Sequence, residues 1–205
     1  HYNCIMRDSA GQDASAACKN HVYLETFGCQ MNDNDSSRMI GFLRDINYIR
    51  TEEPDKADLI LINTCSIRDK AEQKVYSTAG RFRKLKGSNP RLIIAVCGCV
   101  AEQEGERLLK RAPYIDIVLG TQNIHRLREV LAEVKTKKKA VLATGFKERI
   151  EEGEYSVHQE SVGVKAFVSI MRGCNNFCSY CVVPYTSGPE VSRDSGGIIR
   201  EIESL

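Results

Sequence analysis

The sequence lacks any long hydrophobic run. Its longest uninterrupted apolar stretch covers residues 92–97, far below the roughly 18 residues that a membrane-spanning helix needs. The first 20 residues are polar and contain no apolar core of a secretory signal. We therefore expect no membrane association and no export signal, and we place the protein in the cytoplasm.

An excess of charge of one sign is also absent. The sequence has 29 Lys and Arg against 27 Asp and Glu, which gives a formal net charge of +2. This balance neither demands nor excludes a nucleic-acid partner. Internal repeats and low-complexity tracts are missing as well. With 42% hydrophobic and 27% charged residues among 205, the chain has the composition of a globular protein with one full domain and part of another.

Strand-like and helix-like segments alternate along the chain. Apolar runs of strand length occupy residues 21–27, 58–63, 92–97 and 115–119. Apolar residues recur at helical spacing over residues 39–46, 67–85, 101–111 and 124–134. Asp33 or Asn34 can cap the first of these helices. The alternation predicts an α/β fold, an open parallel sheet with helices on both faces.

The rhythm breaks after residue 135. A lysine-rich segment, a short possible strand at residues 140–144 and a charged stretch follow, which together indicate a linker. A new alternating strand at residues 166–171 begins a second unit, which has only about 35 residues, too few to close a core. We expect an N-terminal extension, an α/β domain, a linker and the start of a second domain, at residues 1–20, 21–135, 136–164 and 165–205.

Cysteine is plentiful for a chain of this kind. An odd number, nine, in a chain without an export signal argues against a disulfide framework and favours free thiols that bind metals. The sharpest pattern is Cys174-x3-Cys178-x2-Cys181, directly after a predicted strand. Three thiolates on one short loop suit an iron–sulfur cluster with one iron left open. A structural zinc site is the alternative, but no Cys or His follows Cys181 to complete four ligands.

Three further cysteines are dispersed but regularly placed. Cys29, Cys65 and Cys99 each follow a predicted strand, and they are separated by 36 and 34 positions, close to the length of one strand–helix unit. The carboxyl ends of parallel strands lie at one edge of a sheet, so the three thiolates can converge there on a second cluster. The alternative for each is an inert buried thiol. Cys97 is ambiguous, and strand packing is favoured for it.

The cysteine loop resembles the signature of radical S-adenosylmethionine enzymes. In that superfamily the open iron binds S-adenosylmethionine, and the fold is a partial (βα) barrel whose first strand precedes the loop. The resemblance therefore implies that the second unit is the first βα element of such a barrel. It also implies cofactor contacts for Tyr180, which precedes the last cysteine, and for Phe177.

Longer segments resemble the MiaB-type tRNA methylthiotransferases. The segments are residues 25–32 (ETFGCQMN), 63–75 (NTCSIRDKAEQKV), 98–103 (GCVAEQ) and 170–186 (IMRGCNNFCSYCVVPYT). The resemblance implies that Cys29, Cys65 and Cys99 hold an auxiliary 4Fe-4S cluster, and that Cys174, Cys178 and Cys181 hold the radical-generating one. Residues 187–193 (SGPEVSR) depart from the arginine-rich stretch usual in the family.

The family reaction implied by this resemblance is methylthiolation of a tRNA. The carbon C2 of N6-isopentenyladenosine, beside the anticodon, loses hydrogen to a radical derived from S-adenosylmethionine and gains a methylated sulfur. Such a carbon has no acidic proton, so acid–base catalysis cannot activate it. The expected partners are the tRNA substrate and a reductant protein of flavodoxin or ferredoxin type.

Two alternatives stay open at the level of sequence. Methylthiolation of another substrate, such as a different tRNA adenosine or a ribosomal protein, uses the same residues. A cysteine-rich metal-binding module without catalysis uses only the thiols. Basic residues that could contact RNA are Arg81, Arg83, Lys84, Lys86 and the run at residues 135–139, although a solvated helix face and linker explain them more simply.

Overall fold

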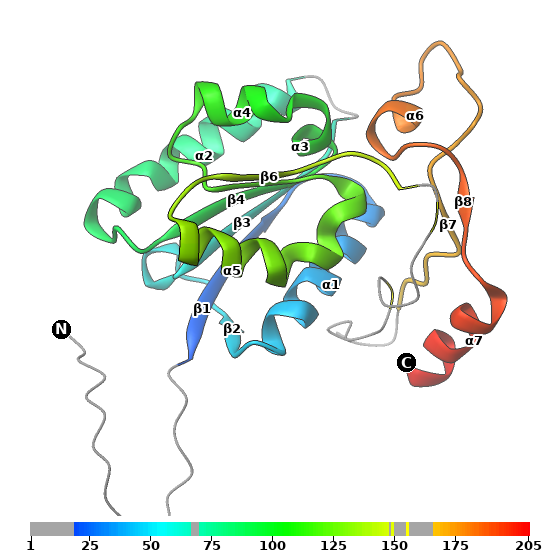
Figure 1. The fold of residues 1–205 in the computed structure, drawn as a ribbon, viewed down its shortest axis with the longest axis horizontal. Helices are drawn as coiled ribbons and strands as arrows, with labels where there is room; N and C mark the ends of the chain where they lie inside the picture. Colours follow the sequence, from blue (N-terminus) through cyan, green and yellow to red (C-terminus); the bar gives the residue numbers. More distant parts are fainter. Residues whose placement is uncertain (1–18, 67–69, 148, 150–154, 156–165) are drawn as a thin grey trace, which may run out of the picture.

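The computed structural model describes residues 19–66, 70–147, 149, 155 and 166–205. Its larger part is a six-stranded parallel sheet in the order β2-β1-β3-β4-β5-β6 (Figure 1). These strands are β1 (Asn20–Thr26), β2 (Tyr48–Arg50), β3 (Leu59–Thr64), β4 (Ile93–Gly98), β5 (Ile117–Leu119) and β6 (Val141–Ala143). The predicted α/β class and its open parallel sheet are confirmed.

Helices cover both faces of this sheet. They are α1 (Gln30–Arg44), α2 (Ala71–Ser88), α3 (Cys99–Glu104), α4 (Glu106–Arg111) and α5 (Leu127–Lys137), with 3-10 turns η1 (Pro54–Lys56) and η2 (Thr121–Arg126). Leu59 and Leu61 of β3 pack into the core under α1 and α5, whereas Ile60 and Ile62 pack into the core under α2 and α4. Figure 1 shows these two helical layers on either side of the strands. Burial on both faces explains why β3 and β4 are continuous apolar runs.

A smaller unit follows the sheet. It contains β7 (Met171–Arg172), α6 (Val183–Thr186), β8 (Val191–Ser192) and α7 (Ser195–Ser204). The prediction of a strand over residues 166–171 is wrong for most of its length, because only Met171 and Arg172 pair, in an antiparallel ladder with β8. The alternation there does not bury an apolar face, since Ile170 is 59% exposed while the polar Ser169 is buried.

Other boundaries also differ from the sequence predictions. Helix α1 begins at Gln30 with Cys29 as its N-cap, so the predicted cap at Asp33 or Asn34 is wrong. The helix predicted over residues 101–111 is split at Gly105, whose φ of +50° interrupts it between α3 and α4. Strand β2 was not predicted, because it has three residues of which only Tyr48 is buried. The short strand predicted at residues 140–144 is confirmed as β6, which pairs with β5.

None of the helices in the described ranges has the length and apolar character that a membrane crossing requires.

Candidate metal centre

The cysteines at positions 29, 65 and 99, here called the sheet-edge cysteines, lie along one edge of the sheet. Cys65 directly follows β3, Cys99 directly follows β4, and Cys29 follows β1 by three positions. These three strands are immediate neighbours in the sheet. Their register aligns Thr26 with Asn63 and Asn63 with Cys97, so the strands end level with one another. The topology therefore brings the three positions to one edge of the sheet, as the spacing predicted.

A buried amide network holds Cys29 against the end of β3. The Asn32 side-chain oxygen accepts a hydrogen bond from the Cys29 backbone N–H at 3.3 Å and lies 3.4 Å from its sulfur. The Asn32 Nδ2 donates to the Thr64 carbonyl at 3.0 Å. Asn63 Nδ2 donates to the Asn32 carbonyl at 2.8 Å and to Ser36 Oγ at 2.9 Å. Because both asparagines are almost fully buried, these bonds fix the entry into α1.

Gly28 leaves room for this arrangement. A Cβ at this position, where φ is +148°, would lie 2.3 Å from Asn32 Oδ1 and 2.6 Å from Cys65 Cβ. Any side chain there would separate Cys29 from the end of β3. The glycine thus permits the backbone just before Cys29 to approach Cys65 closely.

Burial differs among the thiols at this edge. Cys29 is exposed, Cys65 is buried and Cys99 is half-buried. Burial raises the pKa of Cys99 to about 11, and the nearby thiols of Cys65 and Cys29 add smaller contributions in the same direction. A metal that binds Cys99 must therefore displace the proton of this thiol.

Cys97 belongs to the core and not to this edge. It is fully buried among the apolar residues under α1 and α5. Its carbonyl accepts a hydrogen bond from Thr64 Oγ1 at 2.7 Å, and burial raises the pKa of its thiol to about 12. Strand packing is therefore confirmed for Cys97. Cys4 and Cys18 lie outside the described residues.

The second trio, here called the loop cysteines, comprises Cys174, Cys178 and Cys181 between β7 and α6. The backbone N–H of Asn176 points at the Cys174 sulfur at 3.4 Å, and its side-chain amide lies 3.7 Å from the same atom. The N–H of Cys181 donates to the Cys178 carbonyl at 3.0 Å. Donors aimed at a sulfur stabilise negative charge on it, which suits a metal-bound thiolate.

The aromatic residues of this loop are open to solvent. Tyr180 is 90% exposed and Phe177 is 70% exposed. Phe177 meets Tyr185 edge to face, with ring centroids 6.0 Å apart. Exposed aromatic faces beside the cysteines are available to stack on a planar ligand.

All seven cysteines in the described ranges are free thiols. Within those ranges, no three His, Cys, Asp or Glu side chains are grouped closely enough to hold a single metal ion.

A cavity of about 330 Å³ separates the sheet edge from the smaller unit. Cys29 and Cys99 line it from the sheet, and Gly173, next to Cys174, lines it from the other side. Figure 1 shows the smaller unit beside the ends of the strands. The remaining wall includes Met31, Met171, Val182 and Val183. The cavity is therefore large and apolar enough for an organic ligand.

Sequence reasoning missed the charged residues of this cavity. Asp35 and Arg38 both line it, and their side chains lie 3.6 Å apart. Burial raises the pKa of Asp35 to about 6, against the opposing effect of the Arg38 charge. Tyr155 lies between two guanidinium groups, 4.2 Å from that of Arg38 and 4.0 Å from that of Arg193. The available signal was the polar side chains on the first turns of α1, which begins directly after Cys29.

The stretch at residues 187–193, which departs from the expected arginine-rich pattern, still supplies internal contacts. Its one arginine, Arg193, pairs with Glu201 of α7 and donates to the Ser169 carbonyl. The side chains of Arg193 and Glu201 are almost fully buried. Arg193 therefore has a structural role within the smaller unit.

Three of the basic residues considered for RNA contact have ion-pair partners in the fold. Arg81 pairs with both carboxylate oxygens of Glu25, at 2.8 and 2.7 Å. Lys86 pairs with Asp116, and Lys137 pairs with Glu133 at 2.7 Å. These contacts favour a paired, solvated surface over a dedicated phosphate site.

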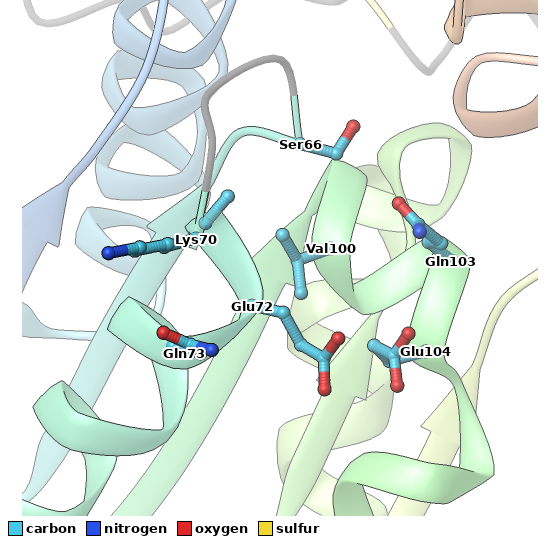
Figure 2. A pocket seen from close by; sticks show the side chains of 8 residues that line it. Ser66, Lys70, Glu72, Gln73, Val100, Gln103 and Glu104 are labelled. Atoms are coloured by element: carbon cyan, nitrogen blue, oxygen red, sulfur yellow. The ribbon is translucent and has the colours of Figure 1, made fainter.

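A second cavity of about 290 Å³ lies between α2 and α3 (Figure 2). Its walls carry Ser66, Lys70, Glu72, Gln73 and Glu104. Figure 2 shows the Glu72 side chain of α2 and the Glu104 side chain of α3 at this cavity. Each is matched by an arginine, because Arg111 lies 2.6 Å from Glu72 and Arg107 lies 3.2 Å from Glu104.

Comparison with known proteins gives two further findings. Residues 21–120 match the model described as Uncharacterized protein family UPF0004. Relatives named tRNA-2-methylthio-N(6)-dimethylallyladenosine synthase match most of the chain. The relative from Pelobacter propionicus is 50% identical over 91% of this chain and 42% of its own length. Those from Syntrophotalea carbinolica and Mannheimia succiniciproducens are 47% and 49% identical, over 89% and 90% of this chain and 42% and 39% of their own lengths. The chain thus spans about two fifths of these curated relatives.

Proposed function

Because the chain belongs to the family of the MiaB-type tRNA methylthiotransferases, carrying its UPF0004 domain over residues 21–120, we propose that the protein methylthiolates a tRNA. The proposed reaction places a methylthio group on C2 of N6-isopentenyladenosine beside the anticodon. It is a radical reaction that depends on S-adenosylmethionine.

One observation carries this proposal: a single cavity is lined by two of the sheet-edge cysteines and by the neighbour of the first loop cysteine. Cys29 and Cys99 line it from the sheet, and Gly173, the neighbour of Cys174, lines it from the loop. An enzyme that generates a radical at one centre and transfers sulfur from another must hold both beside the same substrate atom. A cavity of about 330 Å³ between the trios suits an extruded base.

The donor set fits two 4Fe-4S clusters, because each trio supplies three free thiols and cysteine thiolates are the usual ligands of such clusters. A cube-shaped cluster is bonded at separate corners, which suits three cysteines spread over the ends of three adjacent strands. We assign Cys29, Cys65 and Cys99 to the auxiliary cluster, and Cys174, Cys178 and Cys181 to the other. When bound, these clusters and S-adenosylmethionine supply the electron, the radical and the sulfur chemistry.

The residues of the chain hold the cysteines in place, offer rings to the cofactor and shield the cavity from water. The amide network of Asn32 and Asn63 holds Cys29 in place, and Asn176 directs its donors at the Cys174 sulfur. Tyr180 and Phe177 offer exposed rings for the adenine of S-adenosylmethionine. Met31 and Met171 make the cavity wall apolar, which limits access of water to a radical.

The proposal extends to partners and location. The substrate is a tRNA, and a flavodoxin- or ferredoxin-type protein supplies electrons in the cytoplasm. Arg81, Lys86 and Lys137 have ion-pair partners within the chain, so they are not assigned to the tRNA contact.

Metal and sulfide analysis tests the cofactor assignment. After anaerobic reconstitution with iron and sulfide, the protein should bind about eight irons and about eight sulfides per chain. Stoichiometric zinc without sulfide would contradict the assignment and favour a non-catalytic metal-binding module.

Two triple variants test which cysteine trio serves radical formation and which serves sulfur transfer. Replacement of Cys174, Cys178 and Cys181 by alanine should abolish formation of 5′-deoxyadenosine by the cluster-loaded protein. Replacement of Cys29, Cys65 and Cys99 should spare that formation and abolish the methylthio product on isopentenylated tRNA. A methylthio product from the second variant would show that the auxiliary site lies elsewhere. Product on a ribosomal protein instead of tRNA would reassign the substrate.

A further inference from the structure

Two polar residues connect the sheet edge to the cysteine loop. Thr121 and Gln122 follow β5, the neighbour of β4, which directly precedes Cys99. Both line the cavity between the two trios. Gln122 is only 3% exposed, although it is a polar residue outside every cysteine motif.

Their side chains bind two consecutive carbonyls of the smaller unit. Thr121 Oγ1 donates to the Thr186 carbonyl at 2.7 Å. Gln122 Nε2 donates to the Ser187 carbonyl, also at 2.7 Å. The two bonds join residues 65 positions apart in the chain. Paired short bonds to adjacent carbonyls fix both the position and the direction of that backbone segment.

Hydrogen bonds hold the side-chain amide of Gln122 at both of its ends. Its oxygen accepts a hydrogen bond from the Lys147 backbone N–H at 2.7 Å, so both ends of the amide are engaged. The next residue of the loop, Gly188, packs closely on this group. A Cβ at Gly188 would lie 2.6 Å from the Phe146 ring and 2.9 Å from Gln122 Nε2. Only a glycine allows the loop to approach this closely.

The contact continues directly to the first loop cysteine. The Gly188 carbonyl accepts a hydrogen bond from the Cys174 N–H at 3.1 Å. Gly173 fits against the same turn, because a Cβ there would lie 2.0 Å from the Pro189 carbonyl oxygen. The path from Gln122 to Cys174 is therefore continuous and made of short backbone contacts.

We infer that Thr121 and Gln122 are positioning residues that set the spacing between the sheet-edge cysteines and the loop cysteines. They act through the carbonyls at positions 186 and 187. The inference rests on the proposed function, in which both trios serve one substrate atom. A displacement of about 1 Å between reacting centres costs on the order of 100-fold in rate.

Amide hydrogen exchange of the cluster-free chain tests the placement without any cofactor or substrate. Gln122→Ala and Thr121→Val should each accelerate exchange in residues 172–188 by about 10-fold or more, while β3 and β4 exchange as in the unchanged protein. Thr121→Ser keeps the hydroxyl donor and should restore slow exchange. Gln73→Ala, at an exposed glutamine of α2, is the matched control and should change nothing.

Unchanged exchange in residues 172–188 of both variants would overturn the inference. Equal acceleration in β3 and β4 would also overturn it, because these residues would then stabilise the whole fold and not the loop.

A second readout separates this inference from the proposed function. In cluster-loaded Gln122→Ala, 5′-deoxyadenosine formation should stay within about 2-fold of the unchanged protein, while the methylthio product falls by about 10-fold or more. An equal fall in both, or a change in neither, would overturn the positioning role. If the unchanged protein itself makes no methylthio product, the proposed function fails, and the exchange result still decides whether Gln122 places the loop.

Discussion

Asn63 is a buried residue at the end of β3 whose side chain uses both of its ends. Its Nδ2 donates to the Asn32 carbonyl and to Ser36 Oγ, and its oxygen accepts from Asn32. Asn63→Asp places an acceptor against the Asn32 carbonyl in a buried site. We expect a loss of about 2 kcal/mol or more in the free energy of unfolding, measured by urea denaturation.

The same change at Asn175 is the matched control. Asn175 is exposed and uses only its oxygen, which accepts from the Glu190 N–H at 3.0 Å. Asn175→Asp keeps that acceptor and should alter the free energy of unfolding by less than about 0.5 kcal/mol. Equal effects of the two substitutions would show that the amide network does not stabilise the sheet edge.

The buried carboxyl of Asp35 makes the stability of the protein depend on pH. Burial raises the pKa of its carboxyl from the ordinary 3.8 to about 6, so the folded protein binds this proton more tightly than the unfolded chain. The resulting stability is fully present below about pH 4 and is lost as the pH rises toward about pH 6. The change is on the order of 3 kcal/mol.

The Asp35→Asn variant should lack this pH dependence of the free energy of unfolding. Urea unfolding of the cluster-free variant and of the unchanged protein across that pH range measures the difference. Asp33→Asn, at an exposed position on the same helix, should retain this pH dependence. If Asp35→Asn retained it too, another group would be responsible.

At the scale of elements, the junction between β4 and α3 depends on Gly98. Its φ is +92°, and a Cβ there would lie 2.4 Å from the Thr64 carbonyl oxygen of β3. Gly98→Ala should therefore reduce the free energy of unfolding by more than about 2 kcal/mol, measured by thermal or urea denaturation.

Gly87, near the end of α2, provides the comparison. A Cβ there meets no atom within 4 Å, so Gly87→Ala should be neutral or stabilise by up to about 1 kcal/mol. Similar losses at both glycines would mean that helix propensity, and not the close approach at the sheet edge, governs the result.

At the scale of the whole molecule, the two units differ in how they are stabilised. The sheet buries large apolar side chains on both faces. In the range 166–205 the buried residues are mostly polar or small: Ser169, Pro184, Thr186, Gly188 and Glu201. We expect amides of β7 and β8 to exchange on the order of 100-fold faster than those of β3 and β4, measured by hydrogen exchange of the unchanged protein. Equal protection would mean that the two units unfold as one.

Prediction from sequence succeeded where local patterns are strong. Strands β3 and β4 contain near-continuous apolar runs of strand length, which are typical of parallel strands buried on both faces. Strand β2 and the break at Gly105 were missed, because three residues or one backbone angle leave little trace in hydrophobic periodicity. The spacing of Cys29, Cys65 and Cys99 also predicted their common edge, although their role as ligands remains a prediction.

The sequence by itself determined the α/β class, the order of most elements and the two cysteine trios, because these follow from residue type and short-range periodicity. Only the tertiary structure decided that Asp35 and Arg38 face the cavity and that Gln122 reaches Ser187 across 65 positions. Such contacts depend on how the loop docks against the sheet edge. No local pattern records that docking, because its energy comes from side chains that meet only after the chain has folded.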